Sequence, residues 1–149
     1  MNTNHKSSSH VQVQAENIIF DKVEQLLNIK LEKNKPIPLA NAHIEPDFYS
    51  SEFAVVGEIH AHIGKPKPSQ SHKIANDILK MLLLEKVSGR EYRKIIVVCD
   101  VAEKKALEGK SALAESIRQF GIEILYIELD DAIKKQILDA QETQKMTNV

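Results

Sequence analysis

The chain has 149 residues, 42% of them hydrophobic and 28% charged, and its 20 Lys and Arg residues against 21 Asp and Glu residues leave a formal net charge of −1. Such a chain can form one domain with a real core, and its charge balance excludes a protein that binds nucleic acid or membranes through total charge alone. The single cysteine excludes an internal disulfide framework, and no apolar run reaches the roughly 20 residues of a membrane span. We therefore expect a cytoplasmic protein that does not contact a membrane.

The first half of the chain is expected to hold one helix and then strands. Residues 1–12 are polar and lack periodicity, which predicts a disordered leader. Apolar residues at helical spacing predict an amphipathic helix over residues 13–33, ended by two prolines. Two or three antiparallel strands are expected next, with one strand at 39–49 and the strongest at 53–63. Residues 64–69, rich in proline and glycine, predict a loop.

The second half alternates helices and strands. Ser69 or Ser71 is expected to cap a helix that runs to about residue 87. Apolar runs predict core strands at 94–99 and 122–129, separated by a helical stretch with a break near Gly109. A last helix over 130–141 precedes a polar tail at 142–149. This order predicts a single α/β domain over residues 13–141 with a mixed sheet, in which the later strand-helix-strand unit is a right-handed parallel crossover.

Acidic and histidine side chains gather in the middle of the chain. Asp47 follows a proline, and further along, Glu58 and His60 are spaced to share one face of the strongest predicted strand. If the preceding strand folds back, Asp47 lies beside Glu58, and two carboxylates converge on one cation. Oxygen ligands of this kind suit Mg²⁺ or Mn²⁺, which can polarise a phosphoryl oxygen and generate hydroxide.

The pattern Pro46-Asp47, followed by Glu58-x-His60, resembles the signature of the PD-(D/E)XK, or restriction-endonuclease-like, nuclease superfamily, with histidine in place of the signature's lysine. The resemblance implies a mixed sheet flanked by helices, with an αβββαβ core that this chain extends by helix, strand and helix. It also implies a nuclease that hydrolyses phosphodiester bonds with Mg²⁺ or Mn²⁺, with DNA favoured over RNA as the partner.

The same resemblance implies a ligand set. Asp47 and Glu58 would hold the metal, joined by the backbone carbonyl of Ile59 and by Glu16 from the first helix. Because imidazole is only partly charged near neutral pH, His60 is expected to share the role of the missing lysine with Lys73, in the first turn of the following helix.

A basic stretch directly after Glu58 completes the expected site. Lys65, Lys67 and His72 lie in a segment without acidic residues and are expected to bind the phosphate backbone. A chain this small needs a second copy or another partner to surround a duplex, so a homodimer is one expectation.

Each of these residues also has an ordinary structural interpretation. Asp47 can be a turn residue, Glu58 can pair with a buried His or Lys, and Glu16 can be a solvated acid in the first turn of its helix. His43 is interpreted as a structural strand residue, Lys65 and Lys67 as a solvated loop, and Gln70 and Ser71 as helix caps.

Other functions stay open at this point. His60 and His62 with Glu58 can form a transition-metal site. The histidine at the lysine position can mark a catalytically inactive module that binds nucleic acid or acts as a scaffold. A histidine can also serve with Lys73 in a metal-independent ribonuclease. Cys99 ends a predicted core strand without an evident base, which argues against cysteine catalysis.

Overall fold

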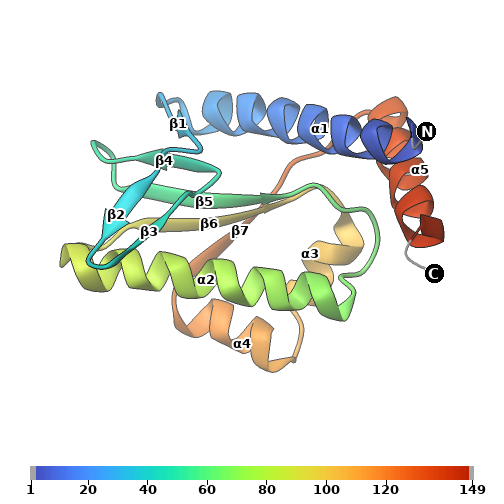
Figure 1. The fold of residues 1–149 in the computed structure, drawn as a ribbon. Coiled ribbons are helices and arrows are strands. Elements are labelled where there is room, and N and C mark those ends of the chain that lie inside the picture. Colours follow the sequence, from blue (N-terminus) through green and yellow to red (C-terminus); the bar gives the residue numbers. More distant parts are fainter. Residues whose placement is uncertain (1–2, 148–149) are drawn as a thin grey trace.

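A mixed sheet with helices on both faces forms the body of the protein in the computed structural model, which describes residues 3–147 (Figure 1). The sheet has five strands in the order β1-β4-β5-β6-β7. These strands are β1 (Glu32–Lys33), β4 (Phe48–Ser50), β5 (Val55–His60), β6 (Arg93–Val98) and β7 (Ile122–Tyr126). β4 pairs antiparallel with β1 and β5, whereas β5, β6 and β7 run parallel. The predicted mixed α/β class is therefore confirmed.

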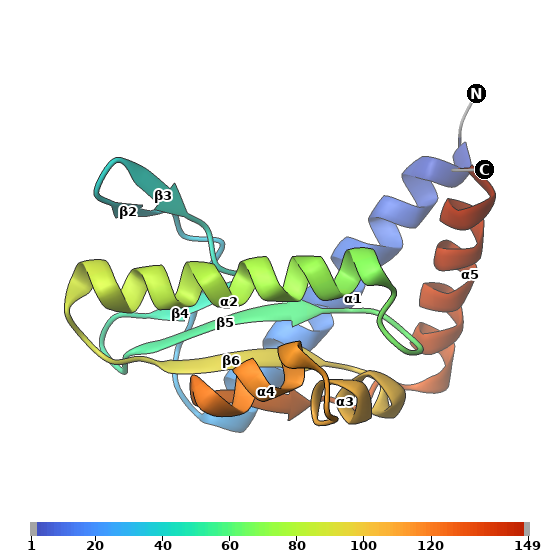
Figure 2. The ribbon, with the colours of Figure 1, turned by 90° about the horizontal axis from the view of Figure 1, so that it is seen from below.

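The helices form a layer on each side of this sheet. Helix α1 (Thr3–Leu27) crosses one face, and α2 (Pro68–Ser88) and α4 (Ala112–Gln119) cover the other (Figures 1 and 2). Helix α3 (Val101–Leu107) follows β6, and α5 (Asp131–Thr147) packs against α1. No helix within the described range is long and apolar enough to cross a membrane.

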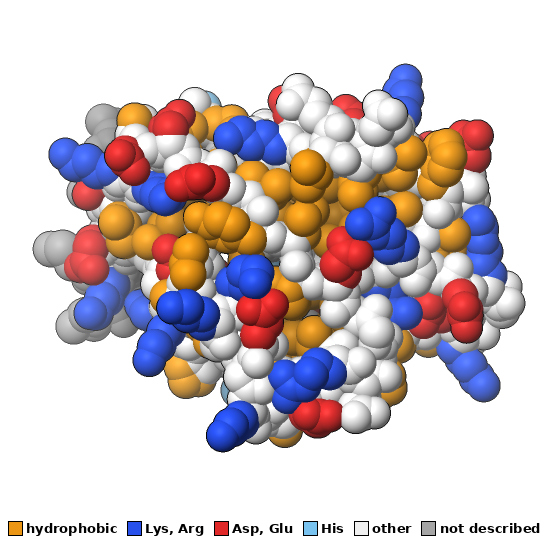
Figure 3. All heavy atoms as spheres, turned by 180° about the vertical axis from the view of Figure 1, so that it is seen from behind, with side chains coloured by type: hydrophobic (Ala, Val, Ile, Leu, Met, Phe, Trp, Pro, Cys, Tyr) orange, Lys and Arg blue, Asp and Glu red, His pale blue; other side chains and the backbone are white. Residues whose placement is uncertain are grey.

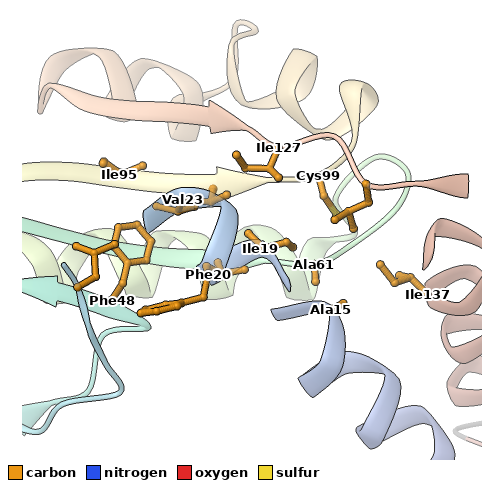
Figure 4. Close-up of a cluster of buried hydrophobic side chains, with 14 of the residues drawn as sticks. Ala15, Ile19, Phe20, Val23, Phe48, Ala61, Ile95, Cys99, Ile127 and Ile137 are labelled. Carbon is orange, nitrogen blue, oxygen red and sulfur yellow. The ribbon is translucent and has the colours of Figure 1, made fainter. Parts of the chain in front are cut away.

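Two apolar cores result from the alternation of side chains along the buried strands. On the α1 side, Ile19 and Val23 pack with Ile95 of β6, and Ile137 of α5 closes the same cluster (Figure 4). On the α2 side, Ile96 belongs to the second cluster with residues of α2 and α4. β6 is buried on both faces, as the continuous apolar run predicts.

The first helix differs from its expected bounds. Residues 3–12, expected as a disordered leader, belong to α1, and residues 1–2 lie outside the described residues. The helix ends at Leu27 rather than near residue 33, because Asn28 adopts a left-handed conformation with φ of 56°. The carboxylate of Glu24 then accepts a hydrogen bond of 2.9 Å from the Leu31 N–H, which stabilises the turn into β1.

The segment expected as one strand at 39–49 is divided. β2 (Ile37–Leu39) and β3 (Ala42–Ile44) form a separate two-stranded sheet, joined by a tight turn in which Ala40 has φ of 57°. This hairpin projects beside α2 in Figure 2. His43 lies exposed on β3, as a structural strand residue.

The remaining boundaries shift by less. Lys67, rather than Ser69 or Ser71, precedes the first residue of α2, and the break near Gly109 separates α3 from α4. β7 ends at Tyr126 and forms an edge of the sheet instead of lying inside it. Apolar side chains gather on the face of the molecule that is shown in Figure 3. Helix α5 continues to Thr147 through most of the expected polar tail, and residues 148–149 are not described.

Candidate active site

Asp47 and Glu58 meet at the end of the β4–β5 ladder. The last paired residues there are Phe48 and Gly57, so Asp47 lies across from Glu58 just beyond the pairing. The Asp47 N–H donates to Glu58 Oε2 at 3.4 Å, and the Ile59 N–H donates to Asp47 Oδ2 at 2.7 Å. These two bonds hold the carboxyl groups of Asp47 and Glu58 next to the end of the ladder, as the spacing in the sequence predicts.

Glu58 is the most strongly perturbed acid of this group. Its residue is 8% exposed, and burial, followed by the charges of Asp47 and Asp77, raises its pKa to about 9. A buried carboxyl beside two other acids stays protonated at neutral pH unless a cation offsets the repulsion. The arrangement therefore favours binding of a positive charge between the carboxyl groups.

Glu16 approaches the same region from α1. Because α1 begins at Thr3, Glu16 lies inside the helix, and the interpretation as a solvated first-turn acid is wrong. Gln12 Nε2 donates to Glu16 Oε1 at 3.3 Å. The pKa of Glu16 is raised, chiefly by burial and further by the charge of Asp47. The hydrogen bond from Gln12 and the charges of Lys73 and His60 act in the opposite direction and lower it. Glu16 is thus within electrostatic reach of Asp47, Lys73 and His60.

The carbonyl of Ile59 projects toward the open end of this ladder. In a β-strand the N–H and C=O of one residue point to the same edge, and the Ile59 N–H points to Asp47. No β4 residue pairs with Ile59, since the ladder stops at Gly57. The carbonyl oxygen therefore faces the side of the strand on which Asp47 lies.

His60 makes a contact that the sequence reading missed. Its Nε2 lies 3.0 Å from Asp77 Oδ2, with both side chains buried, although the two atoms are not aligned as a hydrogen bond. Asp77 lies on the buried face of α2 between Ile74 and Met81. An acid at an apolar helix position is the signal that could have identified it.

Lys73 reaches the site from α2. It lies in the second turn rather than the first, because the helix begins at Pro68. It is exposed, and it lines a cavity of about 450 Å³ together with Glu16 and His60. The structure therefore brings Lys73 and His60 to one cavity, as their expected shared role requires.

His62, on the same row, has a structural role. Its Nε2 contacts the Lys65 carbonyl at 3.2 Å, and its Nδ1 contacts Gln70 Nε2 at 2.7 Å. Gln70 Oε1 in turn accepts from the Lys67 N–H at 2.7 Å. Burial lowers the pKa of His62, which favours a neutral ring with one N–H donor and one acceptor. With both ring nitrogens engaged, His62 has no free nitrogen for the transition-metal site considered above.

The expected phosphate-binding residues lie in the loop before α2 and in the first turns of that helix. Lys65 and His72 are exposed, and Lys67 lines a second hollow of about 410 Å³ with His62 and Gln70. Of the two expected caps, Gln70 does hold the start of α2, through its bond from Lys67. These cations are free to move toward a phosphate chain.

Two further residues near the site, Glu103 and Cys99, are fully buried. Glu103, in α3, lines the larger cavity and was not singled out from the sequence, where it looks like an ordinary helix acid. Cys99 is buried, and burial with the charge of Glu103 raises its pKa to about 12. A thiol so protonated is a poor nucleophile, which agrees with the argument against cysteine catalysis.

Residues 3–147 contain no group of three or more His, Cys, Asp or Glu side chains placed to hold a metal ion. Comparisons with family models, curated proteins and solved structures find no match for the chain. The function is therefore argued from the geometry of the site alone.

Proposed function

We propose that this protein is a restriction-endonuclease-like PD-(D/E)XK nuclease that hydrolyses phosphodiester bonds, with DNA favoured over RNA and with Mg²⁺ or Mn²⁺ as cofactor. The observation that carries the proposal is the placement of two carboxyl groups at the end of a ladder, where Glu58 accepts from the Asp47 N–H and Asp47 accepts from the Ile59 N–H. Two carboxyl groups held this close repel each other when both are ionised, and a bound cation would relieve that repulsion.

The donor set fits a hard divalent cation. Asp47 and Glu58 would hold it directly, the Ile59 carbonyl faces the same side, and Glu16 is close enough for the charge of Asp47 to act on its pKa. Mg²⁺ keeps several waters and needs only one or two carboxylates from the protein, so fewer than three clustered acids suffice. Such an ion supplies a polarised phosphoryl oxygen and an acidified water when bound.

Lys73 and His60 have different parts in the proposed site. Lys73 is exposed at the cavity, so its ammonium can follow the phosphate and offset the charge that develops on it. His60 is fixed against Asp77 and cannot move as freely. We assign phosphate and water positioning to Lys73, and the orientation of the neighbouring carboxyl groups to His60.

Cleavage with and without metal tests the proposal and its two alternatives. Labelled single-stranded DNA, duplex DNA and RNA are incubated with the protein in Mg²⁺, Mn²⁺ or excess chelator, and binding of Mn²⁺ is measured by calorimetry. We expect cleavage only with metal, and binding of Mn²⁺ below millimolar concentration. Absence of both overturns the proposal in favour of an inactive binding module, and cleavage of RNA in chelator favours the metal-independent ribonuclease.

Replacing Lys73 with methionine is expected to lower the cleavage rate about 10²- to 10³-fold, because a charge stabiliser of the transition state is lost. Lys73 is exposed, so the free energy of unfolding should change by less than about 0.5 kcal/mol. Single-turnover cleavage and urea unfolding measure the two effects. Lys86→Met, at the far end of the same helix, is the matched control and should cleave normally. Equal rates for Lys73→Met and wild type would remove Lys73 from the site.

A further inference from the structure

The cavity beside the candidate site is lined by more than the proposed site residues. Glu16, His60 and Lys73 line it together with Glu103 in α3 and Gln141 in α5. Its volume of about 450 Å³ falls in the range of sites that hold one small organic ligand. Asp47 and Glu58 are not among its lining residues.

Glu103 is the unusual group of this lining. The residue is 0% exposed, and both of its carboxyl oxygens lack a hydrogen-bond partner among the described residues. Burial, with the charge of Asp100, raises its pKa to about 8. An unsatisfied buried carboxyl destabilises a fold, so its presence at a cavity wall points to a ligand that satisfies it.

The neighbouring polar groups are already engaged. Gln141 Oε1 accepts from the Ile63 N–H at 2.9 Å, and Gln141 Nε2 donates to the Ile63 carbonyl at 3.1 Å. His62 and Gln70 bond to each other at 2.7 Å. These bonds fix part of the cavity wall. Of the described lining residues, Glu103 and His60 keep buried polar atoms without a hydrogen-bond partner, and the His60 atom lies 3.0 Å from Asp77 Oδ2, whereas Glu103 has no such neighbour.

We propose that the cavity binds, beside Glu103, one unpaired nucleotide next to the phosphodiester to be cleaved, with the edge of its base hydrogen-bonded to the carboxyl group of Glu103. The inference rests on the proposed nuclease function. A carboxyl group offers a donor and an acceptor side by side, or two acceptors, and the edges of the bases present complementary pairs of such groups. The cavity has room for a single nucleotide, so the substrate is a strand end or an unpaired position rather than an intact duplex.

Binding in chelator, where the proposed cleavage is blocked, tests the subsite separately from the chemistry. Fluorescence anisotropy measures the Kd of the full chain for three DNAs of one sequence: a blunt duplex, a duplex with an unpaired overhang, and the same overhang made abasic. We expect the wild type to bind the intact overhang about tenfold more tightly than the other two, a difference typical of one good hydrogen-bonded contact. Equal affinities for the intact and abasic overhangs would overturn the proposal.

Two variants assign the effect to Glu103. Glu103→Leu should lose the preference and raise Tm by a few degrees, because it removes an unsatisfied buried carboxyl group. Glu103→Gln keeps a donor and an acceptor and should keep much of the preference. Glu108→Gln, an exposed acid at the end of the same helix, should bind as the wild type does. An unchanged preference in Glu103→Leu would contradict the assignment.

The outcomes for subsite and function are independent. An overhang preference that depends on Glu103, in a protein that cleaves none of the DNA or RNA substrates with metal, leaves the subsite standing and removes the nuclease. Metal-dependent cleavage without any preference for the unpaired base removes the subsite alone.

Discussion

Replacing Glu58 with glutamine is expected to abolish metal-dependent cleavage and, in metal-free buffer at pH 7, to raise the free energy of unfolding by about 3 kcal/mol. In the folded protein the pKa of Glu58 is raised from 4.5 to about 9, so folding at neutral pH requires a proton that the unfolded chain does not hold. Glutamine needs no proton. Its amide can still accept from the Asp47 N–H, as Glu58 Oε2 does.

The dependence on pH has a definite sign. Between pH 4.5 and about 9 the folded metal-free protein binds a proton at Glu58 that the unfolded chain releases, so the free energy of unfolding falls as pH rises through that window. Glu103, whose pKa is raised to about 8, contributes a slope of the same sign. Urea unfolding at pH 6 and pH 8.5 should therefore show a smaller loss of stability in Glu58→Gln than in the wild type.

Bound metal is expected to oppose this fall in the free energy of unfolding of the wild type. If Asp47 and Glu58 hold a divalent cation as proposed, that cation would replace the proton on Glu58, so Mn²⁺ should raise the Tm of the wild type, and more strongly at pH 8.5 than at pH 7. Glu58→Gln should show little of this shift. Glu52→Gln, an exposed acid in the turn before β5, is the control and should behave as the wild type in both assays. Cleavage by Glu58→Gln, or a lower stability than the wild type without metal, would contradict the assignment.

The sequence allowed the carboxyl pair to be predicted because two local signals agreed. Glu58 is an acid inside an apolar strand, and a strand places alternate residues on one face. The turn between β4 and β5 then fixes the register that brings Asp47 alongside. The mixed sheet followed from the buried apolar run of β6 and from the alternation of helices and strands.

Glu103 could not be assigned in this way. It lies on a short helix with ordinary polar neighbours in sequence, and it becomes a buried acid only through the packing of that helix. Asp77 was missed although it occupies an apolar position in the helical pattern of α2. Helix α1 likewise extends through a polar segment that carries no apolar periodicity of its own. Contacts between distant segments, rather than local propensity, decide these features.

The cavity is lined both by residues that were predicted from the sequence and by residues that were not. Its walls come from α1, the end of β5, the start of α2, α3 and α5, so no contiguous segment describes it. Its lining includes Glu16, which the sequence reading named, and Glu103, which it did not. A site of this kind depends on the sheet holding its helices at fixed positions, which makes the close packing near Asp47 a condition for function.

Replacing Gly57 with alanine tests that condition. A Cβ atom at Gly57 would lie 2.0 Å from Cζ of the Phe48 ring, which is fully buried against α1 (Figure 4). The ring has no free space to enter, so we expect the free energy of unfolding to fall by about 3 kcal/mol. Phe48 directly follows Asp47, and its displacement should also misplace that carboxylate. Cleavage should therefore fall although no proposed ligand is changed.

Urea unfolding and single-turnover cleavage measure both effects, and the double variant Gly57→Ala/Phe48→Leu distinguishes crowding from a loss of strand flexibility. The smaller leucine side chain makes room for the new methyl group, so the double variant should recover part of the stability lost in Gly57→Ala. Gly109→Ala, between α3 and α4, is the control, because its Cβ would approach no atom closer than 3.2 Å and should cost less than about 1 kcal/mol. A Gly57→Ala protein as stable as the wild type would show that the Phe48 ring can repack, and that the position of Asp47 does not depend on this contact.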